Sequence, residues 1–357
     1  MTQVVTFDFG GKFSPVSYEN LLTSIAVLAK KSRDVLVLGC REEDCNPLEH
    51  YAQTIALQEH IHNLGMKFCV LFNFYTQYTQ EHLSGIDVDY IDFMLLKTIH
   101  NAPAPIANQG SRILFLIGKP DRPHRAPLLY KFYERDQLDQ LSWSLFIPAE
   151  IENQVRKLVP HAADQQWQEF MKLQGSPDGV TPMVSGSSIH VCNYCHYDAK
   201  IFADTNVSLV SESMFEQSNT LTVRATEKTY KAINNRHPFV IAGPTGTLER
   251  LQSLGYKTFE KYLPHPGYDQ EVNNDVRLEL IYENILALHK LAIDHPEVLA
   301  NDVEHNYTVN KHRYQQQLDC AAGMLAKYGY HGPAIDVLML HDQVAPNTLT
   351  EKFMDII

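Results

Sequence analysis

The residues with the clearest chemical potential form a short segment, Thr226-Glu227-Lys228, which is followed one helical turn later by Lys231. Their spacing predicts that they open a helix, and that this helix comes after a strand over 207–210 and the acidic residue Glu212. Backbone N–H groups, the helix dipole and lysines at a helix N-terminus suit a diphosphate, and a carboxylate there can accept the two hydroxyls of a ribose. The segment therefore indicates a nucleotide-diphosphate site. The alternative is an exposed capping box, because Thr226 can cap a helix and charges are common in a first turn.

A second group of charged residues follows the apolar run over 113–117, which is typical of a buried strand. This loop contains Lys119, Arg122 and Arg125. A planar guanidinium group can hold two phosphate oxygens at once, so we expect the loop to lie near the phosphates of the same ligand. The alternative is a basic loop that is simply solvated.

Both segments carry a family resemblance. Residues 208–259 resemble the nucleotide-sugar-binding half of glycosyltransferases of the two-Rossmann (GT-B) class. They are most similar to the C-terminal domain of α1,3-fucosyltransferases and to related uncharacterised proteins, many from bacteriophages. The shared pattern is a strand with a carboxylate, an E-K pair that opens a helix, an apolar strand, a G-P pair and a helix that ends in glycine. Here these elements are Glu212, Thr226-Glu227-Lys228, residues 238–242, Gly243-Pro244 and Gly255. Upstream, residues 113–146 are similar to the strand, basic loop and helix of the same proteins.

The resemblance implies the roles of individual residues. Glu227 would contact the donor ribose and Lys228 the donor diphosphate. The other donor-binding residues that it implies are Lys119, Arg122, Arg125, Glu212, Thr226, Lys231 and Gly243. The nucleotide-sugar would be a co-substrate, and no cofactor is expected.

Transfer at a sugar anomeric carbon requires that the leaving diphosphate is neutralised and that the acceptor hydroxyl is deprotonated. The cations named above would serve the first task. We expect no D-x-D sequence at a strand end, and therefore a metal-independent reaction; the resemblance implies inversion by direct displacement. For the catalytic base, the carboxylates at the tips of the N-terminal strands are Asp8, Glu42 and Glu43, of which Asp8 and Glu43 are our candidates. Each of them is also a common type of turn or capping residue.

These residues need an α/β scaffold to position them. In the first half, apolar runs predict strands over 4–9, 34–38 and 67–74, and helical spacing predicts helices over 18–31 and 50–64. This alternation implies a parallel sheet that is buried on both faces. Further strands are predicted over 113–117, 142–147, 207–210 and 238–242. Further helices are predicted over 127–135, 227–235 and 248–254, around an apolar stripe formed by Leu278, Ile281, Ile285, Leu288 and Leu291, and over 314–328.

We therefore predict an α/β fold with two Rossmann-like domains that face each other across a cleft, as in the GT-B type, and a mainly helical C-terminal tail. The predicted boundaries are 1–150 for an N-terminal acceptor domain, 151–290 for the nucleotide-sugar-binding domain and 291–357 for the helical extension.

Composition bears on the acceptor and on location. The 357 residues include 30 Lys and Arg and 42 Asp and Glu, which gives a net charge of −12. Proteins that wrap a nucleic acid over most of their surface usually carry a basic footprint, but a local basic cleft is still compatible with this charge. The phage-like resemblance makes a hydroxymethylated base in phage DNA one candidate acceptor, and a cell-surface or lipid-linked glycan another. The longest apolar runs fall short of the roughly 20 residues that a membrane-spanning helix needs, and the N-terminus lacks a basic region. We therefore expect no membrane span and a cytoplasmic location, which would be the host cytoplasm if a phage encodes the protein.

One cysteine motif allows other hypotheses. The segment Cys192-Asn-Tyr-Cys195-His196 matches the C-x-x-C-H pattern of covalent haem attachment, which normally requires export. A zinc site would need two more ligands, for which His190, Cys40 and Cys45 are conceivable. We expect ordinary reduced thiols and no metal. A rival interpretation of the whole chain is a non-enzymatic binding module on the same fold, stabilised or not by zinc.

Overall fold

The computed structural model of the chain describes residues 3–8, 35–41, 59–64, 67–72, 88–90, 92–100, 102, 105, 110–173, 199–216, 225–327 and 331–335. The chain divides into two compact units. The described residues before 98 and after 312 form unit 1, and those from 98 to 312 form unit 2.

Unit 1 contains a parallel sheet whose strand order follows the chain. The strands are β1 (Gln3–Asp8), β2 (Val35–Arg41), β3 (Lys67–Phe72) and β4 (Val88–Tyr90). In the register, Val5 lies opposite Val37, and Leu38 lies opposite Cys69. The three long apolar runs are thus confirmed as strands, whereas β4 was not predicted because three residues give too short a pattern. The predicted helix over 18–31 lies outside the described residues, and of the helix over 50–64 the described part is helical over 59–63.

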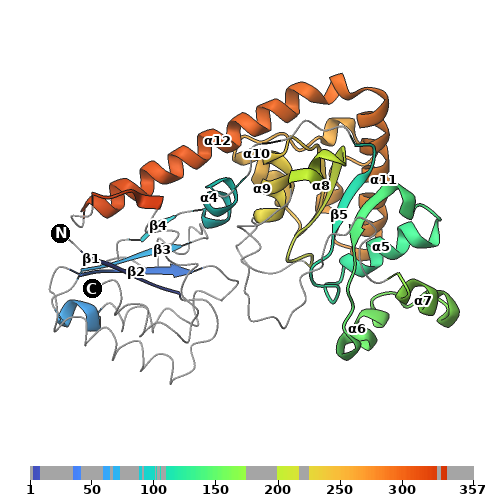
Figure 1. The fold of residues 1–357 in the computed structure, drawn as a ribbon, viewed down its shortest axis with the longest axis horizontal. Coiled ribbons are helices and arrows are strands. Elements are labelled where there is room, and N and C mark those ends of the chain that lie inside the picture. Colours follow the sequence, from blue (N-terminus) through green and yellow to red (C-terminus); the bar gives the residue numbers. More distant parts are fainter. Residues whose placement is uncertain are drawn as a thin grey trace. The chain divides into compact units, whose positions relative to one another are not determined.

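Unit 2 contains a second parallel sheet, made of β5 (Ile113–Leu116), β6 (Leu141–Ser144), β7 (Val207–Ser211) and β8 (Phe239–Ala242). Every residue of β6, β7 and β8 is buried, as expected for a parallel sheet covered on both faces. Figure 1 labels β5 in this sheet, together with helices of the same unit. The spatial order is β6-β5-β7-β8. The chain therefore runs from β5 outward to β6, then returns to the other side of β5 and continues outward from β7 to β8.

Helices follow the strands of unit 2 and cover its sheet. After β5 comes α5 (Arg125–Glu134), after β7 comes α9 (Glu227–Asn234), and after β8 comes α10 (Thr247–Ser253). Between β6 and β7 lie α6 (Glu152–Lys157), α7 (Asp164–Met171) and α8 (Ala199–Ala203). The longer helix α11 (Asn274–Asp294) packs against β7, β8 and α5. Its predicted stripe is confirmed at Leu278, Ile281, Ile285 and Leu288, which are all buried, while Leu291 is half-buried.

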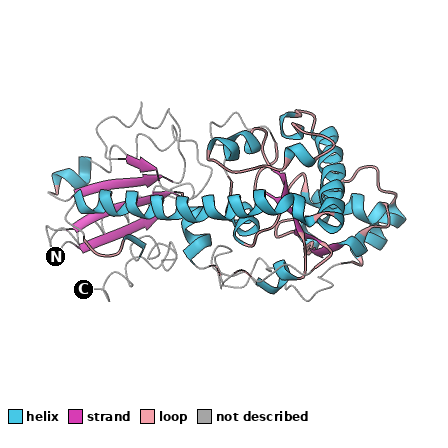
Figure 2. Ribbon diagram, turned by 90° about the horizontal axis from the view of Figure 1, so that it is seen from above, coloured by secondary structure: helices cyan, strands magenta, loops and turns pink. Residues whose placement is uncertain are grey.

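Helix α12 (Pro296–Lys327) is one unbroken helix (Figure 2) that begins well before the predicted start at residue 314. Its residues up to 312 belong to unit 2 and its later residues to unit 1. In unit 2, the amide of Asn306 holds both the N–H and the C=O of Lys257, at 2.7 and 2.8 Å. In unit 1, the backbone N–H of Asp92 donates to Gln317 Oε1 at 2.8 Å. Polar contacts of this kind hold α12 in place. The first half of the helix was not predicted, because its sequence shows no clear helical spacing of apolar residues.

The division of the chain differs from the predicted boundary near residue 150. The structure assigns residues 98–150 to unit 2, since β5 pairs with both β6 and β7. The helix α4 (Phe93–His100) spans the division at residues 97 and 98. The fold is thus of mixed α/β class with parallel four-stranded sheets. Among the helices that the structure describes, none combines the length and the apolar character needed to cross a bilayer.

Candidate functional site

The strand order of unit 2 defines where a ligand is expected. In an open parallel sheet, ligands bind at the carboxyl ends of the strands, at the point where the chain reverses its direction of growth. In the order β6-β5-β7-β8 this point lies between β5 and β7. The loop that leaves β5 is the predicted basic loop, and the connection that leaves β7 leads to Thr226-Glu227-Lys228. The two segments chosen from the sequence therefore meet at the switch point of the sheet.

Glu212 follows β7 and is 1% exposed. Its Oε1 accepts hydrogen bonds from the backbone N–H of Thr226 at 2.9 Å and from the hydroxyl of Thr229 at 2.6 Å, and its Oε2 accepts one from the hydroxyl of Thr226. Thr226 is the N-cap of α9 and accepts the N–H of Lys228 at 3.4 Å. Both carboxylate oxygens are thus engaged by the first turn of α9. Glu212 positions this helix, which differs from the donor contact that the resemblance implied.

Glu227 and Lys228 form an ion pair in the first turn of α9, with 2.5 Å between Nζ and Oε1. The Glu227 side chain is 7% exposed, and that of Lys228 is 30% exposed. Burial raises the pKa of Glu227, but the charge and hydrogen bond of Lys228 and the charge of Lys231 together lower it below its ordinary value. The carboxylate is therefore ionised at neutral pH. Lys228 Nζ also donates to the hydroxyl of Ser213 at 3.5 Å, so the ammonium group reaches from α9 to the segment that leaves β7.

Arg125 is the first residue of α5 and is 3% exposed, and its guanidinium group contacts other protein groups. Its Nε donates to Ser211 Oγ at 2.9 Å, its Nη1 to the carbonyl of Lys119 at 3.2 Å, and its Nη2 to the carbonyl of Glu212 at 3.1 Å. Burial, and next the charge of Arg122, lower the pKa of Arg125 to about 10, which leaves it charged. Since the guanidinium is engaged in this way, Arg125 ties the basic loop to the end of β7. The expected contact of Arg125 with a phosphate stays a prediction, while in the structure these nitrogens contact protein groups.

His124 completes this connection. Its Nε2 lies 3.0 Å from the carbonyl oxygen of Glu212 and 2.9 Å from Ser211 Oγ. Because a carbonyl can only accept, Nε2 carries the proton and Nδ1 is the unprotonated nitrogen. The ring stacks on Phe215 at 4.9 Å between centroids. Burial, followed by the charge of Arg125, lowers the pKa of His124 well below its ordinary value, so the ring is neutral.

The remaining cations of the basic loop are available to a ligand. Lys119 is exposed and Arg122 is half-buried. Arg122 lies close to Arg125, whose backbone N–H donates to the carbonyl of Arg122 at 3.2 Å, and its charge lowers the pKa of both Arg125 and His124. Of the three basic residues chosen from the sequence, Lys119 and Arg122 therefore keep the role of candidate phosphate contacts.

Gly243 lies directly after β8, beside Glu212. A Cβ at this position would lie 3.2 Å from Thr247 Oγ1 and 3.3 Å from Glu212 Cγ. The backbone of Gly243 thus lies so close to Glu212 and Thr247 that a side chain at position 243 would be sterically crowded. Gly243 belongs to the packing around Glu212.

The candidates for a catalytic base lie in unit 1. Asp8 is the last residue of β1 and pairs in register with Cys40 at the carboxyl end of the sheet. Glu42 and Glu43 follow β2 but lie outside the described residues. The sequence does contain one D-x-D, Asp87-Val88-Asp89, but its last two residues begin β4. Asp89 is thus the middle residue of β4, and Asp87 lies outside the described residues.

Within the described ranges, no group of three or more His, Cys, Asp or Glu residues is arranged to hold a metal ion. The motif at 192–196 lies outside these ranges, as does His190. The structure therefore does not test the hypotheses of a zinc site or of reduced thiols at this motif.

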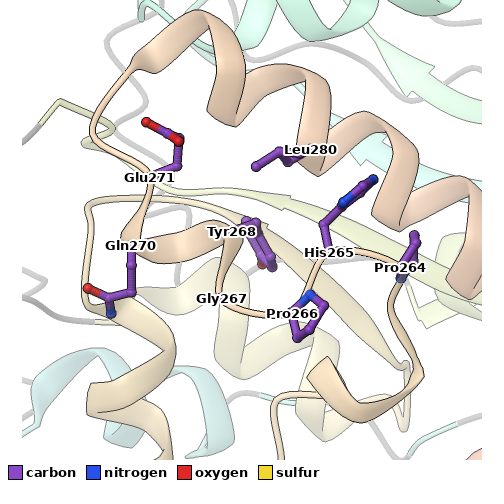
Figure 3. A pocket seen from close by; sticks show the side chains of 8 residues that line it. All are labelled: Pro264, His265, Pro266, Gly267, Tyr268, Gln270, Glu271 and Leu280. Atoms are coloured by element: carbon purple, nitrogen blue, oxygen red, sulfur yellow. The ribbon is translucent and has the colours of Figure 1, made fainter.

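An open pocket of about 470 Å³ lies elsewhere in unit 2, between residues 264–271 and α11 (Figure 3). Pro266, Glu271 and Leu280 line it, together with Tyr268, whose hydroxyl bonds the backbone N–H and C=O of Ile241 in β8 at 2.9 and 3.1 Å. None of the site residues chosen from the sequence lines this pocket.

Sequence reasoning missed several residues of the site. Thr229 lies one turn after Thr226, a T-x-x-T spacing that could have suggested that both hydroxyls meet one carboxylate. The roles of Ser211 and Phe215 depend on the pairing of β5 with β7, which no local pattern reveals. The same holds for Arg277 on α11, which reaches Phe215 from a distant part of the chain.

No protein-family model matches the chain, and the comparison with curated proteins found no match. The assignment of a function therefore depends on the geometry of the site and on the resemblance of its motifs.

Proposed function

We propose that this protein is a metal-independent glycosyltransferase of the GT-B type, with a nucleotide-sugar donor bound to unit 2. The observation that carries the proposal is the ion pair of Glu227 and Lys228 at the N-terminus of α9, beside the switch point of the β6-β5-β7-β8 sheet. Helix N-termini at this edge favour a diphosphate, and an ionised carboxylate beside it suits ribose hydroxyls.

The residues divide into contacts and supports. Lys228, Arg122, Lys119 and Lys231 would neutralise the charge that develops on the leaving diphosphate. Glu227 would accept the ribose hydroxyls. The supports, which hold these groups in place, are Arg125, His124, Glu212, Thr226 and Gly243.

Unit 1 would supply the acceptor side. The proposal includes two Rossmann-like domains that face each other across a cleft. The parallel four-stranded sheet in each unit supports the Rossmann-like character of the domains. The base that deprotonates the acceptor hydroxyl would be Asp8 or Glu43, and direct displacement would invert the anomeric centre. The candidate acceptor is a hydroxymethylated base in phage DNA, modified in the host cytoplasm.

A panel of nucleoside diphosphates and nucleotide-sugars tests the donor site. The matching ligand should raise the melting temperature of the full chain, since it binds the folded state. In Lys228→Met, turnover should fall roughly 10²- to 10³-fold, the range for removal of one group that stabilises transition-state charge. The control is Lys172→Met, which breaks an exposed pair with Glu169 (2.7 Å) and should leave turnover unchanged.

Two results would contradict the proposal. If Lys228→Met and Glu227→Gln both keep donor binding and turnover, the site is elsewhere. If no donor yields a free nucleoside diphosphate, the chain is a binding module. Salt dependence identifies the acceptor class, because binding of DNA weakens steeply with salt and binding of a neutral glycan does not.

A further inference from the structure

Arg277 is a buried arginine whose hydrogen-bonding capacity is only partly used. It lies in the first turn of α11 and is 1% exposed. Its Nη2 donates to the carbonyl of Phe215 and, at 2.9 Å, to Asn274 Oδ1. Its Nε and Nη1 have no hydrogen-bond partner among the described residues. Buried guanidinium nitrogens without partners are costly, and in native proteins such groups usually have a bound ion, water or ligand as their partner.

The carboxylates closest to Arg277 are engaged elsewhere. Asp269 and Glu271 act on it through their charge, but neither forms an ion pair with it within the described part of the chain. Asp269 Oδ2 accepts the N–H of Leu248 at 3.0 Å, and Glu271 Oε1 accepts the N–H of Asn273 at 2.7 Å. Arg277 thus keeps unpaired N–H groups although acidic residues are near.

Aromatic stacking connects Arg277 to the basic loop. Its Cζ lies 3.9 Å from the ring centroid of Phe215, and Phe215 also stacks on His124. Arg277 and Arg122 both act on His124 through their positive charge. Phe215 thus connects the guanidinium of Arg277 to His124, which lies in the basic loop.

Arg277 and Lys228 converge on one short segment of chain. Lys228 Nζ contacts the Ser213 hydroxyl, and Arg277 Nη2 contacts the Phe215 carbonyl. Ser213 and Phe215 are two positions apart in the sequence, so their Cα atoms are separated by about 7 Å at most. Cations from α9 and α11 therefore flank the exit of β7 from two helices.

We infer that Arg277 is a second cationic contact for the diphosphate of the donor and binds its oxygens through Nε and Nη1. This inference rests on the proposed function, since it assumes that Lys228 binds the same diphosphate. It predicts a site in which phosphate oxygens are held from α9 on one side and from α11 on the other.

Calorimetric titration of the full chain with inorganic pyrophosphate tests the inference. Arg277→Gln should weaken pyrophosphate binding about tenfold or more, the effect of one lost hydrogen bond to a charged group, and Arg277→Lys should weaken it less. The matched control is Arg135→Gln, because Arg135 also stacks on a ring, that of Tyr282 at 4.2 Å, at the other end of α5. The control should bind pyrophosphate as the wild type does. Equal affinity in folded Arg277→Gln, or no binding of pyrophosphate by the wild type, would overturn the inference.

A measurement on the wild type covers the case in which the variants do not fold. In protein labelled with ¹⁵N-arginine, the Nε–H signal of Arg277 should shift on addition of pyrophosphate, and an unchanged signal would overturn the inference. The outcomes also separate the two proposals. Loss of donor turnover in Lys228→Met together with normal pyrophosphate affinity in Arg277→Gln would refute only the role of Arg277. Pyrophosphate binding that depends on Arg277, without turnover of any nucleotide-sugar, would refute only the glycosyltransferase.

Discussion

The carboxylate of Glu212 accepts both the backbone N–H of Thr226, at 2.9 Å, and the hydroxyl of the same residue. The two ends of the connection from β7 to α9 are therefore joined by one buried side chain. The candidate ligand contacts, Glu227 and Lys228, come directly after this joint. The position of the ion pair depends on a residue that does not itself need to touch the ligand.

Glu212→Ala should destabilise the protein. It would leave the N–H of Thr226 and the hydroxyl of Thr229 buried without their acceptor, at a cost of about 1–3 kcal/mol for each unsatisfied group. Urea denaturation of the full chain measures the change in the free energy of unfolding. The control is Glu216→Ala, which removes an exposed carboxylate from the same connection and should stay within about 0.5 kcal/mol of the wild type. Equal stabilities of the two variants would show that the hydrogen bonds of Glu212 to Thr226 and Thr229 do not stabilise the position of α9.

Local patterns predicted the strands β5, β7 and β8 because each is a short, wholly or mostly buried apolar run bounded by turn residues. The start of α9 was equally accessible, since a capping threonine before an acidic residue marks a helix N-terminus within a few positions. For these elements, residues that are adjacent in the sequence are sufficient to predict the secondary structure.

The roles of Arg125 and Glu212 could not be predicted in this way. They depend on the pairing of Ile113 in β5 with Val207 in β7, which brings together strands that are far apart in the sequence. Local sequence does not tell a buried arginine from an exposed one. For Arg125, the neighbouring strand β7 decides that the guanidinium contacts backbone carbonyls and not solvent. The same reason explains why residues 98–150 belong to unit 2, because β5 pairs with both β6 and β7.

A substitution at Gly243 should test how tightly Glu212 is packed. Gly243→Ala would place a Cβ 3.2 Å from Ile241 Cγ2 and from Thr247 Oγ1, and 3.3 Å from Glu212 Cγ. Such overpacking costs about 1–3 kcal/mol, so the variant should be less stable by this amount in urea denaturation. Gly118→Ala is the matched control, because a Cβ there would have nothing within 4 Å, and it should be close to neutral. If Gly243→Ala is as stable as Gly118→Ala, the close approach at Gly243 can relax without cost.

The dependence of stability on pH should be traceable to His237, which is buried in unit 2. Its Nδ1 lies 2.9 Å from Ser208 Oγ and its Nε2 lies 2.7 Å from the carbonyl of Phe202, so the neutral ring has a partner on each nitrogen. Burial lowers the pKa of His237 from 6.5 to about 4. Between these values the unfolded chain binds a proton that the folded protein does not, so the contribution of His237 to stability is lost as the pH falls.

Between pH 7.5 and pH 5 this loss should amount to about 2 kcal/mol. Urea denaturation of the wild type and of His237→Gln at both pH values measures it as the difference between their changes in unfolding free energy. Asp269 acts in the opposite direction, because burial raises its pKa to about 6 and its folded form gains protons over the same interval. Since Asp269 is present in both proteins, its contribution cancels in the comparison. Parallel pH profiles for the two proteins would mean that folding does not lower the pKa of His237.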